Sequence, residues 1–99
     1  MTGVVWTAEA IGDLDAVRGY IGRDSPNYAN VVCADIISAV RQLESFPESG
    51  RIVPELQRDV IRELVRGSYR IVYSLRSNER VEVLTVFHGA RLLRLEAFG

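Results

Sequence analysis

The feature that most restricts the fold is a change in the spacing of apolar residues near Gly50. Before this point, apolar residues recur every three to four positions, which is the period of a helix with one buried face. After it, short runs rich in β-branched and aromatic residues are separated by turn-forming residues. The 99 residues therefore predict a single α+β domain over residues 1–99, with its helices first and most of its sheet afterwards.

Two helices are predicted in the first half of the chain. The first begins after Thr7, a residue type that caps helices, and its apolar face ends at Ile21. The second begins at Pro26, with Ser25 as its cap, and Pro47 stops it. Because the connection between them is short, the two helices are expected to pack as an antiparallel hairpin.

Four runs predict strands, and the order of elements is β-α-α-β-β-β. The last three runs should form an antiparallel sheet, with the helical hairpin covering one face. The first strand must join this sheet at a place that the sequence leaves open. Residues 51–59 contain Pro54 and predict a loop or an irregular extended segment. The predicted strands are Gly3–Trp6, Val60–Arg66, Tyr69–Arg76 and Arg80–His88.

Faces can be assigned within the run Tyr69–Arg76, because side chains alternate along a strand. One face should carry Ile71, Tyr73 and Leu75, and the other Arg70, Val72, Ser74 and Arg76.

Every basic side chain apart from the one histidine is an arginine, and the arginines concentrate in the second half. Residues 1–50 hold three arginines against seven acidic residues, whereas residues 51–99 hold nine against six. High genomic GC content would explain the lack of lysine, but not this asymmetry. Arginine binds carboxylates and phosphates through two parallel hydrogen bonds. The arginines on or beside predicted strands are Arg51, Arg62, Arg70, Arg76 and Arg91.

These arginines allow two interpretations. If they face one way, they suit the phosphates of a nucleic acid or the acidic surface of a protein partner. Otherwise they form a solvated sheet face, paired with Glu63, Glu79 and Glu82.

Most catalytic and metal sites have no basis in this sequence. His88 is the only histidine, and neither a nucleophilic serine motif nor a glycine-rich phosphate loop is present. Cys33 is the only cysteine, lies on the apolar face of the second helix and is expected in the core. We therefore predict no metal and no cofactor. His88 is either a general acid or base, since histidine ordinarily titrates near neutral pH, or a structural residue at a strand end.

The chain shows neither a signal peptide nor an apolar run long enough to span a membrane, so we expect a cytoplasmic protein without a membrane partner.

Several motifs together resemble a known family. They are FPESGRIVPEL, IREL, YRIVYSL and VEVLTVFHGARLL, preceded by a helical hairpin that begins after W-T-x-x-A. In this order and spacing, from Val5 to about Leu93, they resemble the RelE/ParE family of bacterial toxins. The resemblance implies a toxin of a type II toxin–antitoxin module, with a helical hairpin on an antiparallel sheet. It also implies a cognate antitoxin that wraps and neutralises the toxin.

The family has two kinds of target. ParE-like members inhibit DNA gyrase, whereas RelE-like members cut mRNA on the ribosome. The ending HGAR resembles the ParE branch, and the chain lacks the lysines and the late tyrosine of RelE-type sites. The resemblance therefore implies a gyrase inhibitor that is not an enzyme. For contact with the partner we expect Arg62, Arg70 and Arg91.

A ribonuclease is the alternative that the family leaves open. A second nuclease pattern uses a glutamate, an arginine and a histidine followed by a tyrosine. Glu55, Arg70 and His88 match its first three positions, whereas Gly89 stands where the tyrosine would be. The resemblance would make Glu55 or His88 the base, Arg70 the group that stabilises transition-state charge, and His88 or a ribosomal group the acid. A third possibility is a member that has lost toxicity and keeps only antitoxin binding.

Overall fold

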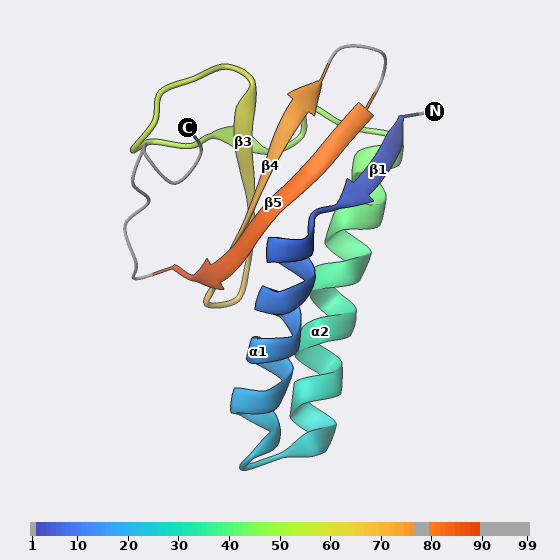
Figure 1. Ribbon diagram of the computed structural model, residues 1–99, viewed down its shortest axis with the longest axis vertical. Coiled ribbons are helices and arrows are strands. Elements are labelled where there is room, and N and C mark those ends of the chain that lie inside the picture. Colours follow the sequence, from blue (N-terminus) through green and yellow to red (C-terminus); the bar gives the residue numbers. More distant parts are fainter. Residues whose placement is uncertain (1, 77–79, 90–99) are drawn as a thin grey trace.

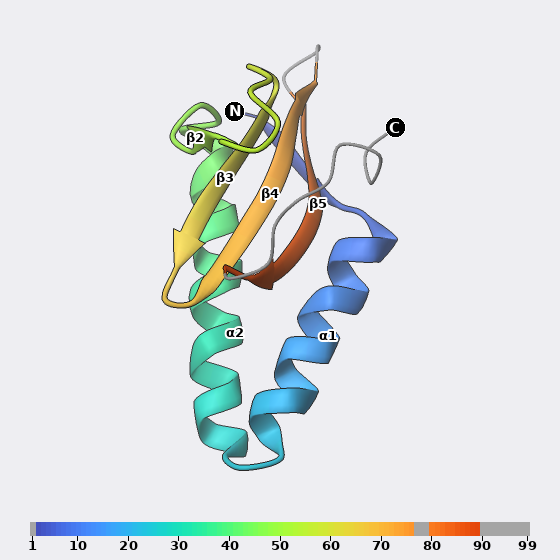
Figure 2. The same cartoon turned by 90° about the vertical axis from the view of Figure 1, so that its left-hand side faces the viewer.

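The computed structural model describes residues 2–76 and 80–89 and has the predicted α+β architecture (Figure 1). Two helices form an antiparallel hairpin that lies on one face of a five-stranded sheet and extends beyond the end of the sheet (Figures 1 and 2). The elements are β1 (Gly3–Trp6), α1 (Ala8–Gly22), α2 (Pro26–Arg41), the short 3₁₀ helix η1 (Gln42–Glu44), β2 (Arg51–Ile52), β3 (Ile61–Arg66), β4 (Tyr69–Arg76) and β5 (Arg80–His88).

The helices begin where the capping residues predict. The Thr7 side chain accepts a hydrogen bond from the Ala10 N–H at 3.2 Å, and the Ser25 side chain accepts one from the Tyr28 N–H at 3.1 Å. Pro26 occupies the first turn of α2, where its missing N–H costs no helical hydrogen bond. Local capping chemistry thus determines both helix starts.

The sheet has the strand order β1-β5-β4-β3-β2 and is mixed. Strands β3, β4 and β5 are antiparallel, as expected, whereas β1 runs parallel to β5. β1 is an edge strand, and its parallel pairing with β5, a place that the sequence left open, makes the sheet mixed. The segment predicted to be irregular also contains a short strand, β2, which pairs with β3.

Both faces of the sheet carry buried apolar side chains. On the face under the helices, Ile36 of α2 packs against Ile71 and Val83. The opposite face, called the open face below, has a smaller cluster that the segment between β2 and β3 completes. The faces predicted for β4 are confirmed, because Ile71 and Tyr73 pack under the helices whereas Val72 belongs to the cluster on the open face. Cys33 is buried as expected. The open-face cluster consists of Val53, Ile61, Val72 and Phe87.

A β-bulge in β5 joins the sheet to the first helix. The register with β4 shifts between Val72 and Tyr73, which leaves Leu84 without an opposite residue. The Asp13 carboxylate of α1 accepts hydrogen bonds beside this bulge from the Thr85 hydroxyl and, at 3.0 Å, from the Val86 N–H. These bonds hold α1 against the centre of β5.

Within the described residues, no helix is long and apolar enough to cross a membrane.

Candidate functional site

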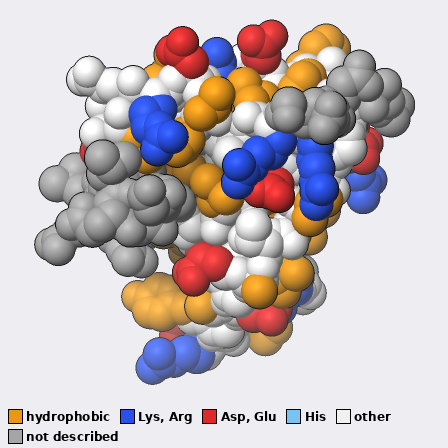
Figure 3. Space-filling model, turned by 45° about the horizontal axis from the view of Figure 1, so that its top comes forward, with side chains coloured by type: hydrophobic (Ala, Val, Ile, Leu, Met, Phe, Trp, Pro, Cys, Tyr) orange, Lys and Arg blue, Asp and Glu red, His pale blue; other side chains and the backbone are white. Residues whose placement is uncertain are grey.

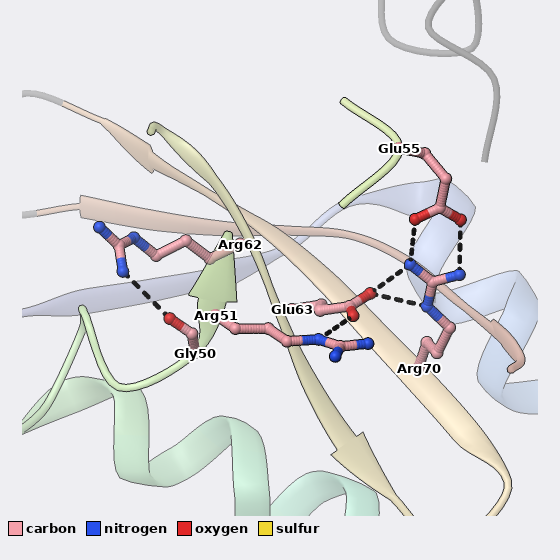
Figure 4. Close-up of polar contacts among 6 residues, drawn as sticks. All are labelled: Gly50, Arg51, Glu55, Arg62, Glu63 and Arg70. Atoms are coloured by element: carbon pink, nitrogen blue, oxygen red, sulfur yellow. Dashed lines mark hydrogen bonds and ion pairs between the residues drawn. The ribbon is translucent and has the colours of Figure 1, made fainter. Parts of the chain in front are cut away.

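Four charged side chains form a continuous chain across the open face (Figure 4). Strand register explains part of the arrangement: Arg51 of β2 lies opposite Glu63 of β3, and Arg70 of β4 lies opposite Val65, two residues further along β3. Glu63 and Arg70 are therefore diagonal neighbours on one face. Glu55 reaches them from the segment between β2 and β3. We call Arg51, Glu55, Glu63 and Arg70 the Arg70 cluster.

The Arg70 guanidinium is held on two sides. Its Nη1 and Nη2 donate to the two carboxylate oxygens of Glu55, each at 2.7 Å, and its Nε donates to Glu63 at 2.7 Å. The guanidinium also lies over the Phe87 ring, 5.2 Å from its centre. The hydrogen bond to Glu55 is the main cause that raises the pKa of Arg70, burial opposes it, and the hydrogen bond to Glu63 adds to it. Arg70 is thus a permanent cation.

Glu63 is the buried centre of the cluster. Its side chain has no exposed surface, and its second oxygen accepts a hydrogen bond from Arg51 Nε at 2.6 Å. A buried carboxylate is tolerated only when it is paired and hydrogen-bonded, and two arginines satisfy that need here. From the sequence, Glu63 is expected only as one of the acids on a solvated sheet face. The sequence does contain a sign that Glu63 is buried: it lies between Ile61 and Val65 on the same face of β3, so its strand neighbours on that face are apolar.

The structure brings Glu55 and Arg70 together but places His88 elsewhere. His88 lies opposite Tyr69 in the register, and their rings meet edge to face at 5.8 Å. Tyr69 packs against the core under the helices, whereas its neighbour Arg70 belongs to the open face. His88 therefore lies on the opposite face of the sheet from Arg70.

The residue after His88 does face Arg70. A Cβ atom built on Gly89 would lie 3.5 Å from Arg70 Cγ. The Ser68 carbonyl oxygen is slightly closer to this Cβ, at 3.3 Å, so a side chain here would start between the β3–β4 turn and the aliphatic part of Arg70. This is the position where the resembling nuclease pattern has a tyrosine.

The strand arginines that the structure describes do not all face one way, so the first of the two interpretations that the sequence left open does not hold for them. Arg62 points to the other side of β3, where it donates to the carbonyl oxygen of Gly50 at 3.1 Å (Figure 4). Arg76 pairs with Glu82 at 3.1 Å. Alternation along β3 and the acids beside the strands separate these guanidinium groups. Arg91 lies outside the described residues.

The separation of the arginine side chains is visible on one face of the molecule. Arginine side chains appear there at separate places, with acidic and apolar side chains between them (Figure 3). A polyanion is bound by several cations that neutralise successive phosphates. This face offers single cations beside acids instead. No group of histidine, cysteine and acidic side chains among the described residues is arranged to hold a metal ion.

Comparison with known proteins places the chain in a family. The model for the ParE toxin of the type II toxin–antitoxin system parDE matches residues 4–93. The chain belongs to the ParE toxin family. The relative named Toxin RelE2, from Caulobacter vibrioides, is 35% identical over 92 residues, which cover 93% of this chain and 100% of that protein. The resemblance seen in the sequence is thereby confirmed.

Solved structures show the same fold. A chain of the chromosomal ParDE system from P. aeruginosa has a TM-score of 0.71 and 23% identity, over 89% of this chain and 96% of that one. A chain of the RelBE2 toxin–antitoxin complex from Mycobacterium tuberculosis has a TM-score of 0.62 and 23% identity, over 88% and 96%. The chain is a toxin of the ParE/RelE superfamily of type II toxin–antitoxin systems.

Proposed function

We propose that this toxin inhibits DNA gyrase by protein–protein contact and that a cognate antitoxin neutralises it. The proposal is supported by the positions and contacts of the residues predicted to be catalytic. Glu55 and Glu63 occupy the Arg70 guanidinium, and His88 lies on the other face of the sheet. Cleavage of RNA needs a base and an acid within hydrogen-bond reach of one phosphate, beside a cation that stabilises its charge. The observed arrangement favours binding over catalysis.

The antitoxin is the partner that the proposal requires. Solved relatives of this fold come from toxin–antitoxin complexes, which supports such a partner here. The sequence predicts contacts at Arg62, Arg70 and Arg91. On the open face Arg70 is the one of these that an acidic side chain of the antitoxin would meet, because Arg62 points to the other side of β3. An added strand or helix is the ordinary way to dock on such a surface. Gyrase acts on chromosomal DNA, so the toxin would act in the cytoplasm. No cofactor is required.

A supercoiling assay tests the proposal. Purified toxin freed of antitoxin is added to gyrase, ATP and relaxed plasmid, and supercoiling is followed on a gel. We expect supercoiling to fall as toxin is added and to recover when antitoxin is supplied. Undiminished supercoiling by a preparation that still arrests growth would reject gyrase as the target.

Ribosome-dependent cleavage of mRNA is the second candidate, because Glu55 and Arg70, two of the three residues that match the nuclease pattern, lie side by side. Primer extension on mRNA from a translation reaction would reveal cleavage. If this candidate holds, the Arg70→Ala and His88→Ala variants lose the cleavage products. Growth of cells that overproduce the toxin, without any arrest, would instead indicate a member that retains antitoxin binding alone.

A further inference from the structure

We propose that Glu55 is an internal occupant of a carboxylate-binding site on Arg70, and that an acidic side chain of a protein partner displaces it. The inference rests on the proposed function in one respect, namely that the toxin binds a protein. It gives Glu55 a role unlike that of a catalytic base. In the free toxin, Glu55 closes the site, and in the complex the partner takes its place.

The two glutamates that hold Arg70 are not equivalent. Glu63 belongs to a strand, and its side chain is 0% exposed, so moving it would leave a buried charge without its partners. Glu55 belongs to the segment between β2 and β3, and its side chain is 17% exposed. Because part of the Glu55 side chain already reaches the surface, we infer that it leaves Arg70 by rotation about its own side-chain bonds. Only one edge of the Arg70 guanidinium is therefore exchangeable.

The geometry of that edge fits a carboxylate. Glu55 receives two parallel hydrogen bonds of 2.7 Å from Nη1 and Nη2, which is the two-pronged arrangement that arginine forms with carboxylates. Glu55 meets the edge of the guanidinium that lies away from Arg51 (Figure 4). An incoming carboxylate can replace Glu55 without the loss of any hydrogen bond to Arg70. The exchange also preserves the charge of the cluster.

The surroundings favour a peptide over a nucleic acid. The Arg70 cluster contains two cations and two anions, so departure of Glu55 leaves a surplus of a single positive charge. A run of phosphates needs several cations. The residue opposite Arg70 on the same face is Val65, 49% exposed, and Phe87 lies under the guanidinium. One cation beside apolar side chains suits an acidic segment that also carries apolar residues.

An internal competitor lowers apparent affinity in proportion to the fraction of molecules in which the site is open. If Glu55 occupies the site about 90–99% of the time, a partner carboxylate binds about 10- to 100-fold more weakly than to an open site. Replacing Glu55 by glutamine removes the competing charge, while Glu63 still holds Arg70. The variant should therefore bind an acidic peptide more tightly than the unaltered toxin does.

The experiment compares the full-length toxin with its Glu55→Gln and Glu9→Gln variants. Glu9 is exposed in the first turn of α1, so its substitution makes the same change in net charge at a remote place. The probe is a fluorescein-labelled synthetic peptide of alternating glutamate and leucine, and its binding is followed by fluorescence anisotropy. We expect Glu55→Gln to bind at least about tenfold more tightly, and Glu9→Gln to stay within about twofold of the unaltered toxin.

Two further measurements make the result specific. Nuclear magnetic resonance of the arginine Nε–Hε groups in Glu55→Gln should show the Arg70 signal shifting as the peptide is added. Addition of Arg70→Gln to Glu55→Gln should remove the gain in affinity, with thermal melting used to verify that each variant is folded. If the double variant does not fold, the shift of the Arg70 signal in Glu55→Gln alone shows whether the peptide binds at Arg70.

Three outcomes would overturn the inference. They are equal affinities of Glu55→Gln and Glu9→Gln, an Arg70 signal that does not respond to the peptide, and tighter binding of a single-stranded RNA of similar length than of the peptide. The assay contains no gyrase and no ribosome. Failure of the gyrase proposal therefore leaves this result intact, and failure here leaves the supercoiling assay unaffected.

Discussion

At the scale of single residues, Tyr73 is fully buried and its hydroxyl is hydrogen-bonded on both sides. This buried hydroxyl accepts a hydrogen bond from the Gly50 N–H at 2.9 Å and donates one to the Pro47 carbonyl at 2.8 Å. It thereby ties the segment after η1 to the centre of the sheet. Gly50 is required by space, since a Cβ atom there would lie 2.6 Å from both the Tyr73 hydroxyl and the Glu63 carbonyl oxygen.

Gly50→Ala should destabilise the protein by about 1–3 kcal/mol, because backbone and a hydrogen-bonded ring would have to move. Gly12→Ala is the matched control: nothing lies within 4 Å of its added Cβ, and the position is in a helix. We expect it to stabilise by up to about 1 kcal/mol. Urea unfolding followed by circular dichroism measures both. A Gly50→Ala protein as stable as the unaltered one would contradict the packing described.

Tyr73 also predicts a loss of stability at alkaline pH. Burial raises its pKa above the ordinary value of 10, although the Gly50 hydrogen bond and Arg62 partly oppose the change. As pH rises, the unfolded chain loses this proton first, so the stabilisation is complete below about pH 10 and declines through the higher folded pKa. Burial raises the pKa of Tyr69 as well, and it adds to the decline.

Urea unfolding between pH 8 and pH 11 measures this dependence. Tyr73→Phe should be less stable at pH 8, because two hydrogen bonds are lost, but its stability should fall less steeply above pH 10. Identical slopes for the two proteins would show that Tyr73 does not contribute.

At the scale of elements, local pattern located the helices and strands, whereas side-chain contacts decided how they join. The predicted strands Gly3–Trp6, Tyr69–Arg76 and Arg80–His88 have the same bounds in the structure. The bulge in β5 was not predicted, because a register shift depends on the neighbouring strand. Asp13 joins α1 to this bulge, and its position on the helix gave no sign of that role.

Asp13→Ala should cost about 1–3 kcal/mol, since the partly buried Thr85 hydroxyl and the Val86 N–H lose their acceptor. Asp15→Ala changes the same residue type at an exposed position of α1 and should stay within about 0.5 kcal/mol. Thermal melting gives the cost, and hydrogen exchange should show faster exchange of the Val86 amide only in Asp13→Ala. Equal melting temperatures for the two variants would remove Asp13 from this role.

At the scale of the whole molecule, the Arg70 cluster joins β2, β3, β4 and the segment between β2 and β3. The helices stabilise one face of the sheet through apolar contact, whereas the open face combines a small apolar cluster with these ion pairs. Both the proposed partner site and the cohesion of the open face therefore depend on Glu63, the one member without exposed surface.

Glu63→Gln should lower the free energy of unfolding by about 3–5 kcal/mol, because it leaves the buried Arg70 without one of its charged partners. Glu82→Gln is the comparison: it breaks an ion pair with the exposed Arg76 and should cost less than about 1 kcal/mol. Urea unfolding at neutral pH measures the free energy of unfolding of both variants. Similar losses in the two variants would mean that burial does not distinguish these glutamates.

The sequence by itself determined the elements and the family, since periodicity, capping and motif order are properties of nearby residues. Only the tertiary structure decided which side chains meet. It set β1 parallel to β5, buried Glu63 between two arginines, and placed His88 on the face opposite Arg70. The physical reason is that strand pairing joins residues distant in the sequence, and a shift of one position moves every side chain to the other face.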